Sequence, residues 1–435
     1  MKASRWLVLG CSLGFVLACG AGDDKKPVRG GEAGDSPSNE GGGGGGGEGG
    51  DAPDPLAGAG GEGEHGGEQA GGAAGAGGAS EGGAAGTEGD GSQEVEEGPP
   101  GSVGNPCTAE GACDSDLVCA LSLYCQPEAS LLPEQIVQAV PLPDSANIPS
   151  QAPIVLFADA TYANVDFAVM AYTTGGAEDI TAQVSVVQLT SASGKDVYVL
   201  ASKGGLPLGA SVVVTLSGDM EGTVVFNVDH ASPPYAEGAL DFEGASQPIA
   251  ECTTDLTVSQ LPLGWTAFGD VGVVPETGTL LPTSGSQLMA MSTGSVLCGN
   301  ALGQTSSMLV SGPIRELGES PALALTYNFQ SSEFDDFCNS EYDDTLIGVL
   351  SGPKGAIATV IDSVNLICQR AMHGAGTFPG LPDGGDGVYK ETANLPFELT
   401  GDVGSPAVLA FVLTDVGDAT LSSLVGIDDI HLAEP

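Results

Sequence analysis

The sequence predicts an all-β protein made of two successive β-sandwiches behind a long disordered N-terminal segment. The first observation is a series of short apolar runs with a period of two, the alternation typical of half-buried strands. The second is the set of Gly-, Ser- and Asp-containing turn signals that separate these runs. The third is composition: with 69 Gly and 28 Pro among 435 residues, much of the chain is expected to be linker.

Residues 1–18 have the features of a bacterial export signal. Two basic residues precede an apolar stretch, residues 6–17, that is too short for a comfortable membrane span. The segment ends Val16-Leu17-Ala18-Cys19, which resembles the lipobox of bacterial lipoproteins, where the signal is cut before an acylated cysteine. This resemblance implies lipidation of Cys19 and a surface-exposed outer-membrane lipoprotein, because Gly rather than Asp follows the cysteine. A plain secretory signal and an N-terminal membrane span are the alternatives.

Residues 19–103 form a low-complexity segment of Gly, Glu, Ala and Asp. Such a segment cannot bury enough apolar surface to offset its conformational entropy, so we predict a disordered tether. The net charge of the whole chain, −46, argues against nucleic acid as a partner.

Residues 104–128 contain four cysteines at a constant spacing of six. In an exported protein they predict two disulfides, with three possible connectivities among Cys107, Cys113, Cys119 and Cys125. Zinc is the rival interpretation, but the segment has no Cys-x-x-Cys pair and no nearby His. The pattern resembles short Cys-rich modules common in surface proteins of myxobacteria. We expect a stiff spacer, since a module of this size needs its bridges to fold.

Residues 133–230 are predicted to form an immunoglobulin-like sandwich. Phe167, Val169 and Ala171 alternate with less apolar neighbours, and further strands fit residues 184–189, 197–201, 211–217 and 223–228. The apolar run Ile154-Val155-Leu156-Phe157, after a Pro-containing opening, resembles bacterial Ig-like domains of the S-layer type.

Residues 239–435 are predicted to form the second sandwich, which is organised around an acidic loop. Strands are expected at residues 322–329 and 345–350, and the loop between them carries six carboxylates and no Lys or Arg. Carboxylates a few ångströms apart repel, so this loop is expected to fold around a cation or remain solvated.

The same stretch resembles a known family. Its motifs are Phe329-x-Ser331-x-Glu333-Phe334, then Tyr342-Asp343-Asp344, then Leu350-Ser351-Gly352-Pro353. Together they resemble the core of the choice-of-anchor L domains, bacterial surface β-domains attached to the cell by varied means. The resemblance implies a location and a fold more than an activity.

The region opens Leu240-Asp241-Phe242-Glu243 and closes Gly426-Ile427-Asp428-Asp429-Ile430-His431-Leu432. Both pieces resemble the first and last strands of jelly-roll domains related to carbohydrate-binding modules. In that fold an early Glu and a late Asp often coordinate a structural calcium, which implies such a role for Glu243 and Asp428. Calcium takes six to eight oxygen ligands. The predicted calcium ligands are Glu243, Glu333, Asp335, Asp336, Asp343, Asp344, Asp428 and Asp429. The alternative is that the acids of the last strand face solvent.

Four further cysteines are assigned to disulfides of this second sandwich. Cys338 and Cys368 flank adjacent predicted strands, so we pair them, which leaves Cys252 with Cys298.

A catalytic role is not expected. The chain has four His, none in a recognisable nucleophile context, and the acidic loop is too dense to separate two carboxylate pKa values as a glycosidase does. The leading hypothesis is a lipid-anchored surface protein that binds a glycan or a protein in adhesion, with calcium supporting its C-terminal sandwich. The first alternative is a structural cell-envelope component without a soluble ligand. The second alternative is the accessory domain of a secreted hydrolase. A single Trp outside the signal, Trp265, weakens the glycan version.

Overall fold

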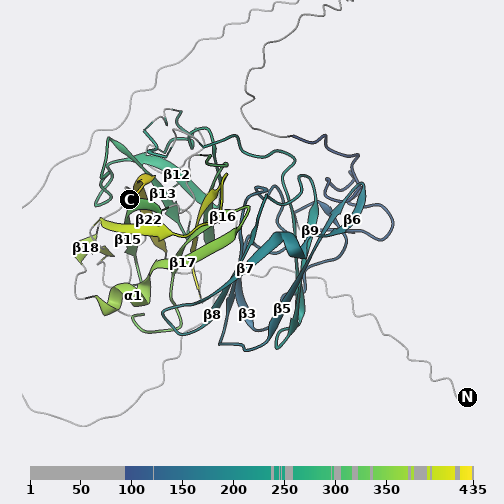
Figure 1. Ribbon diagram of the computed structural model, residues 1–435, viewed down its shortest axis with the longest axis horizontal. Coiled ribbons are helices and arrows are strands. Elements are labelled where there is room, and N and C mark those ends of the chain that lie inside the picture. The colour runs from purple at the N-terminus through teal and green to yellow at the C-terminus, as the bar shows by residue number, and fades with distance from the viewer. Residues whose placement is uncertain are drawn as a thin grey trace, which may run out of the picture. The chain divides into compact units, whose positions relative to one another are not determined.

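Antiparallel β-structure dominates the described part of the chain, which confirms the predicted all-β class (Figure 1). The computed structural model describes residues 94–433, except 121, 237–239, 244, 246, 250–257, 295, 298–304, 316–321, 334–336, 371–373, 377–388, 392–393 and 417–421. The predicted signal, Cys19, most of the tether and the predicted Cys252–Cys298 pair lie outside these residues. Helical structure in the described ranges is limited to α1 (Val364–Gln369) and the 3-10 turn η1 (Thr181–Gln183). No helix in these ranges is long and apolar enough to cross a membrane.

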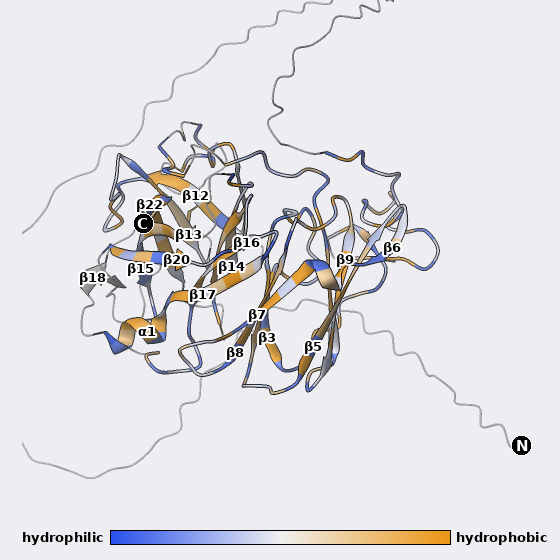
Figure 2. Cartoon of the chain, viewed as in Figure 1, coloured by the Kyte–Doolittle hydropathy of each residue, from blue (hydrophilic) through white to orange (hydrophobic). Residues whose placement is uncertain are grey.

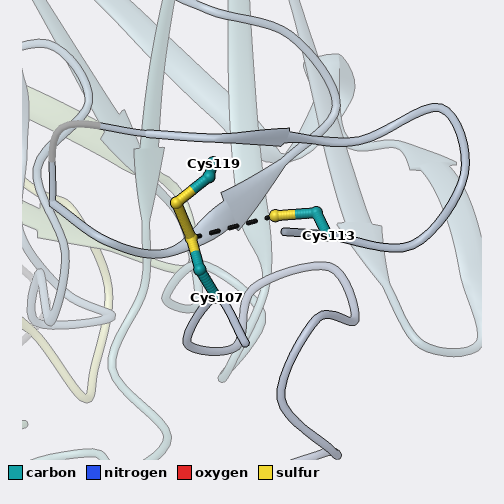
Figure 3. A group of neighbouring side chains, drawn as sticks. All are labelled: Cys107, Cys113 and Cys119. Atoms are coloured by element: carbon teal, nitrogen blue, oxygen red, sulfur yellow. Dashed lines mark hydrogen bonds between the residues drawn. A yellow bond between two sulfur atoms is a disulfide. The ribbon is translucent and has the colours of Figure 1, made fainter. Parts of the chain in front are cut away.

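The small cysteine module is a two-stranded hairpin, β1 (Val118–Cys119) with β2 (Cys125–Gln126), held by two disulfides. Cys107 is bonded to Cys119 and Cys113 to Cys125, which selects one of the three possible connectivities. Figure 3 shows Cys113 beside the Cys107–Cys119 bridge, with the Sγ atoms of Cys113 and Cys107 3.8 Å apart. Because all four sulfurs are in disulfides, this group offers no thiolate to zinc.

The first sandwich consists of two four-stranded antiparallel sheets. One sheet has the order β10 (Gly222–Asn227), β9 (Ser211–Gly218), β5 (Val165–Thr173), β6 (Gly176–Asp179). The other has the order β3 (Ile136–Val140), β4 (Ile154–Ala158), β8 (Asp196–Ser202), β7 (Val184–Thr190). The alternation predicted for β5 is present, since Val169 and Ala171 are buried while Ala168 is exposed.

The second sandwich pairs a five-stranded sheet with a seven-stranded sheet. The five-stranded order is β11 (Trp265–Phe268), β14 (Ser306–Ser311), β21 (Val408–Thr414), β16 (Thr345–Gly352), β17 (Gly355–Ser363). The seven-stranded order is β12 (Asp270–Pro275), β13 (Gln287–Ser292), β22 (Ser423–Leu432), β15 (Ala322–Ser331), β19 (Tyr389–Glu391), β18 (Gly374–Gly376), with β20 (Leu395–Thr400) also on β15. Figure 2 shows that apolar residues concentrate on the strands and polar residues in the connections.

The five-stranded sheet is buried on both faces. Leu409, Phe411 and Leu413 of β21 point into the core of the second sandwich. The alternate residues Ala410 and Val412 instead belong to the core that the first sandwich forms. Strands β14 and β16 divide their apolar side chains between the same two cores.

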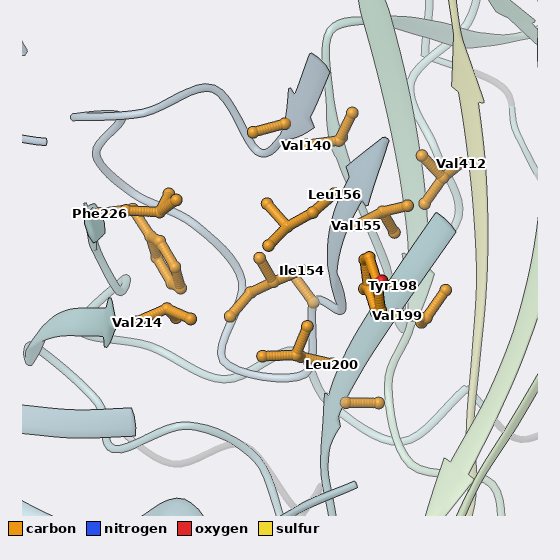
Figure 4. Close-up of a cluster of buried hydrophobic side chains, with 14 of the residues drawn as sticks. Val140, Ile154, Val155, Leu156, Tyr198, Val199, Leu200, Val214, Phe226 and Val412 are labelled. Carbon is orange, nitrogen blue, oxygen red and sulfur yellow. The ribbon is translucent and has the colours of Figure 1, made fainter. Parts of the chain in front are cut away.

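The central strands of one sheet of the first sandwich, β4 and β8, are buried on both faces in the same way. Every residue of β4 is buried, although a strand covered on one face would alternate. In Figure 4, Val155 and Val199 lie toward Val412, while Ile154 lies toward Phe226. The two sandwiches therefore share one continuous apolar core, with the sheet β3-β4-β8-β7 stacked on the sheet β11-β14-β21-β16-β17.

Candidate metal centre

Two carboxylates of the predicted acidic loop are fully buried beside the ends of strands. Glu333 follows β15 and Asp344 directly precedes β16, and both side chains have an exposed fraction of 0%. The turn after β15 is fixed by the N–H of Glu333, which donates to Ser331 Oγ at 3.0 Å. Asp335 and Asp336 lie outside the described residues.

A third carboxylate, Asp415, joins them from a distant part of the chain. It follows β21, and the register Thr345–Thr414 between β16 and β21 places it opposite Asp344. Glu333, Asp344 and Asp415 each offer a carboxylate oxygen, and these oxygens all lie within 4.8 Å of one another. Asp415 is 2% exposed, so the whole cluster, which we call the carboxylate triad, is buried.

Strand alternation explains why the triad lies between the two sheets of the second sandwich. Asp344 has the same parity as Leu346 on β16, and Asp415 the same parity as Leu413 on β21; both leucines belong to the core between the sheets. Glu333 follows β15 of the opposite sheet and lies at an even spacing from Phe329, whose side chain is in the same core. The acids therefore close one end of an apolar interior.

The strand next to β15 carries a buried hydroxyl, that of Ser423 at the start of β22. Ser423 pairs with Ser331 in the register of β22 with β15, and it has the parity of Val425, whose side chain is in the core. Its Oγ is fully buried and has no hydrogen-bond partner among the described residues. Buried polar atoms of this kind usually bond to protein, to an ordered water or to an ion.

The chemistry of these donors fits a hard divalent cation. At an effective dielectric constant of ~20, two ionised carboxylates whose oxygens are at most 4.8 Å apart repel by at least about 3 kcal/mol. A bound cation would offset this repulsion between the three acids. Carboxylate and hydroxyl oxygens are ligands for calcium, whereas magnesium demands tighter octahedral geometry and gives up water reluctantly.

The loop that carries the acids is clamped to α1. The Cys338–Cys368 disulfide, the pairing favoured from sequence, joins the loop to the helix. Asn365 adds two hydrogen bonds: its Oδ1 accepts from the N–H of Asn339 at 2.6 Å, and its Nδ2 donates to Ser340 O at 3.0 Å. Ser363 caps the N-terminus of this helix, because its Oγ accepts a hydrogen bond from the N–H of Leu366.

Asp343 is adjacent to the triad in sequence but points to the other face of β16. It is 1% exposed and has the parity of Ile347, which packs in the core shared with the first sandwich. Its Oδ1 accepts from the N–H of Asn365 at 2.9 Å. Burial raises the pKa of Asp343, and the hydrogen bonds from Asn365 and its neighbours only partly oppose that rise.

A neighbouring buried carboxylate, Asp362, is paired with a cationic side chain. Asp362 is fully buried, and its Oδ2 accepts from Arg370 Nη1 at 2.7 Å and from Tyr327 OH at 2.9 Å. Burial raises the pKa of Asp362, and the Arg370 guanidinium opposes this.

Glu243, predicted as a calcium ligand, serves as a hydrogen-bond acceptor for a loop. Its carboxylate accepts from the N–H groups of Ser286 at 2.8 Å and Gln287 at 2.9 Å, and from Ser286 Oγ at 3.1 Å. Although burial opposes it, this set of donors lowers the pKa of Glu243. Gly285 makes the approach possible: its φ is +61°, and a Cβ there would come within 2.2 Å of the Glu243 carboxyl carbon.

Asp428 accepts hydrogen bonds from the loop that also contacts Glu243, whereas Asp429 lies beside His431. Asp428 Oδ2 accepts from the N–H groups of Thr283 at 2.6 Å and Ser284 at 2.9 Å. Asp428 also lines a cavity of about 10 Å³ with Thr326 and other polar residues, which is room for about one water. Asp429 is half-exposed, with its Oδ1 3.4 Å from His431 Nδ1. The structure thus brings together Glu333 and Asp344 of the predicted ligands, and adds Asp415, which sequence reasoning missed.

Comparison with known proteins identifies no family. No protein-family model matches the sequence, and no curated protein matches it. Among solved structures, the chain is similar to the K1 cleaved adhesin domain of Lys-gingipain from Porphyromonas gingivalis W83. That match has a TM-score of 0.27 and 10% sequence identity, and covers 45% of this chain and 96% of that one.

Proposed function

We propose that this chain is a non-catalytic, lipid-anchored protein of the bacterial cell surface, whose C-terminal sandwich binds a ligand with the support of calcium. The observation that carries the calcium part is the carboxylate triad, three buried acids whose oxygens lie within 4.8 Å of one another. The surface location rests on the sequence ending Val16-Leu17-Ala18-Cys19 and on the disulfides, which belong to an oxidising compartment. A surface glycan or another surface protein is the proposed ligand, in adhesion.

Calcium is expected to raise the melting temperature of the purified full chain by several degrees relative to sodium chloride at matched ionic strength. A cation that binds only the folded protein adds about 2.7 kcal/mol to the free energy of unfolding when it exceeds its Kd a hundredfold. Extracellular calcium sites often have a Kd of about 10⁻⁴–10⁻³ M, so millimolar concentrations are needed. Magnesium is expected to give a smaller shift.

Two variants make this measurement specific. Asp344→Asn removes one charge of the triad and is expected to abolish the calcium shift. Glu341→Gln removes the same charge from an exposed position in the same loop and is expected to retain it. Equal shifts from calcium and sodium chloride, or an undiminished shift in Asp344→Asn, would refute the site.

The lipid anchor has its own test. Expressed in a bacterium with the lipoprotein pathway, the chain is expected to incorporate labelled fatty acid and to partition into detergent. Cys19→Ser is expected to abolish both, because the thiol is the acylated group in lipoproteins. Equal labelling of the Cys19→Ser variant would contradict lipidation at this residue.

A further inference from the structure

A cavity of about 220 Å³ lies between the two sandwiches, at one edge of their shared core. The first sandwich contributes Gln151 and residues 202–205, at the end of β8 and just after it. The second sandwich contributes Ser351, Pro353 and Val408, among others. Binding sites for small molecules occur preferentially at junctions between domains, so this cavity is a candidate for one.

Strand alternation explains why the cavity forms here. On β16, Ile347 and Val349 fill the shared core, and Ser351 is the next residue on the same face. The register of β16 with β21 places Ser351 opposite Val408, which packs at the edge of that core. A small serine therefore stands where a branched apolar side chain would continue the core, and this leaves space between the sheets.

The wall that the second sandwich contributes is mostly apolar. Pro313, Pro353 and Pro406 all line the cavity. The bridge between Ile314 and Ala407 brings Pro313 and Pro406 onto adjacent segments. An apolar cavity of about 150 Å³ is enough to hold benzene. This larger cavity therefore has room for one six-membered ring that carries a small polar group.

The wall that the first sandwich contributes favours an anion. Lys203 is the one charged residue among those that line the cavity, although the chain has 57 acids. Its Nζ donates to Ala182 O at 3.0 Å, which uses one of its three donors, and no carboxylate pairs with it among the described residues. Gln151 Oε1 accepts from Ser150 Oγ at 2.8 Å, and its Nε2 has no acceptor in the described ranges.

The second sandwich adds one polar group to this set. Ser351 is only 6% exposed, and the described residues offer its Oγ no hydrogen-bond partner. A buried hydroxyl usually has such a partner. The cavity thus combines an apolar wall, an ammonium group and further hydrogen-bond donors, which together are complementary to an amphipathic anion.

We propose that this cavity binds a small monocarboxylate whose body is an apolar group about the size of one six-membered ring. The ring lies against the proline side chains of the second sandwich. The carboxylate faces Lys203 and Gln151 of the first sandwich, and Ser351 supplies a further donor. The site is separate from the carboxylate triad, and its occupation requires no calcium.

An NMR titration of the full chain with benzoate tests the proposal, with benzamide and acetate as comparison ligands. Benzamide keeps the ring and lacks the charge, and acetate keeps the charge and lacks the ring. Benzoate is expected to bind with a Kd of about 1 mM or lower, as is usual for a compact ligand. Benzamide is expected to bind about tenfold more weakly, because hydrogen bonds to charged groups are the stronger ones. Acetate is expected to show no saturable binding.

Two variants locate the binding. Lys203→Met keeps an apolar stem and removes the charge, so it is expected to weaken benzoate about tenfold and to leave benzamide unchanged. Lys195→Met, at another lysine of the first sandwich that does not line this cavity, is the matched control and is expected to change neither affinity. Ser351→Leu fills the cavity and is expected to abolish binding of both ligands without lowering the melting temperature.

Four results would overturn the proposal. The first is the absence of saturable benzoate binding, and the second is equal affinity for benzoate and benzamide. The third is benzoate binding that persists in a folded Ser351→Leu variant. The fourth is an unchanged benzoate affinity in Lys203→Met, because no other cationic side chain is among the described residues that line the cavity. None of these results bears on the calcium site.

Discussion

In calcium-free buffer, the Asp415→Asn variant is expected to be more stable than the natural protein, although it replaces a buried carboxylate. Between ionised forms, removing one of two carboxylates whose oxygens are at most 4.8 Å apart relieves at least about 3 kcal/mol of repulsion at an effective dielectric constant of ~20. In saturating calcium the order is expected to reverse, because only the natural protein gains the binding free energy. Chemical denaturation with and without calcium measures both differences.

The exposed loop acid Glu341 again supplies the control for this prediction. Glu341→Gln makes the same change in charge and is expected to shift stability by less than about 0.5 kcal/mol, as surface substitutions usually do. An Asp415→Asn variant that is less stable than the natural protein in both buffers would show that the triad is held together by hydrogen bonds and not by a cation.

Replacement of Arg370 by Met is expected to lower the free energy of unfolding by about 3 kcal/mol, because it leaves Asp362 buried without its cation. This is the lower end of the range for buried ion pairs, since the Arg370 side chain is 37% exposed and partly screened. The matched control is Lys354→Met, which breaks the exposed pair with Asp402 and is expected to cost at most about 1 kcal/mol.

The pH dependence of this variant has a definite sign. Burial raises the pKa of Asp362 above its unfolded value, and loss of Arg370 raises it further. A carboxyl with a raised pKa in the folded state favours folding when it is protonated, so its stabilisation is present at low pH and is lost as the pH rises. The deficit of Arg370→Met relative to the natural protein is therefore expected to be largest near pH 7 and to shrink toward about pH 4. A deficit that does not change with pH would exclude an unpaired Asp362 as its cause.

Local patterns in the sequence predict most of the strands. Period-two alternation locates β5 and β15, and the apolar run Ile154-Val155-Leu156-Phe157 locates β4. The same run does not indicate which elements pack on its two faces. A strand that is buried on both faces is a continuous apolar run, without the alternation that would distinguish a buried face from an exposed one. Stacking of the two sandwiches therefore could not be predicted from local sequence.

The candidate site was predicted in part, for a related reason. A dense cluster of acids marks Glu333 and Asp344, but Asp415 is a single acid at the end of the apolar strand Val408–Thr414, 71 positions farther along the chain. Only the pairing of β16 with β21 brings it to Asp344. Glu243 and Asp428, also predicted as cation ligands, accept backbone N–H groups from residues 283–287, contacts that no local pattern in the sequence indicates.

Because the two stacked sheets cover each other, the first sandwich has an exposed apolar face until the second sandwich has formed. As the chain is synthesised, the first sandwich is complete once β10 has been made, but the face of its sheet β3-β4-β8-β7 that packs on the second sandwich stays uncovered until β21 has been made, roughly 190 residues later. At a synthesis rate of about 5–20 residues per second, that face is exposed for about 10–40 seconds. During this time the uncovered face exposes apolar side chains, among them Val155, Phe157 and Val199, which can associate with other unfolded chains. Shortened forms of the chain that end before residue 408 are therefore expected to aggregate, because this apolar face has no cover in them.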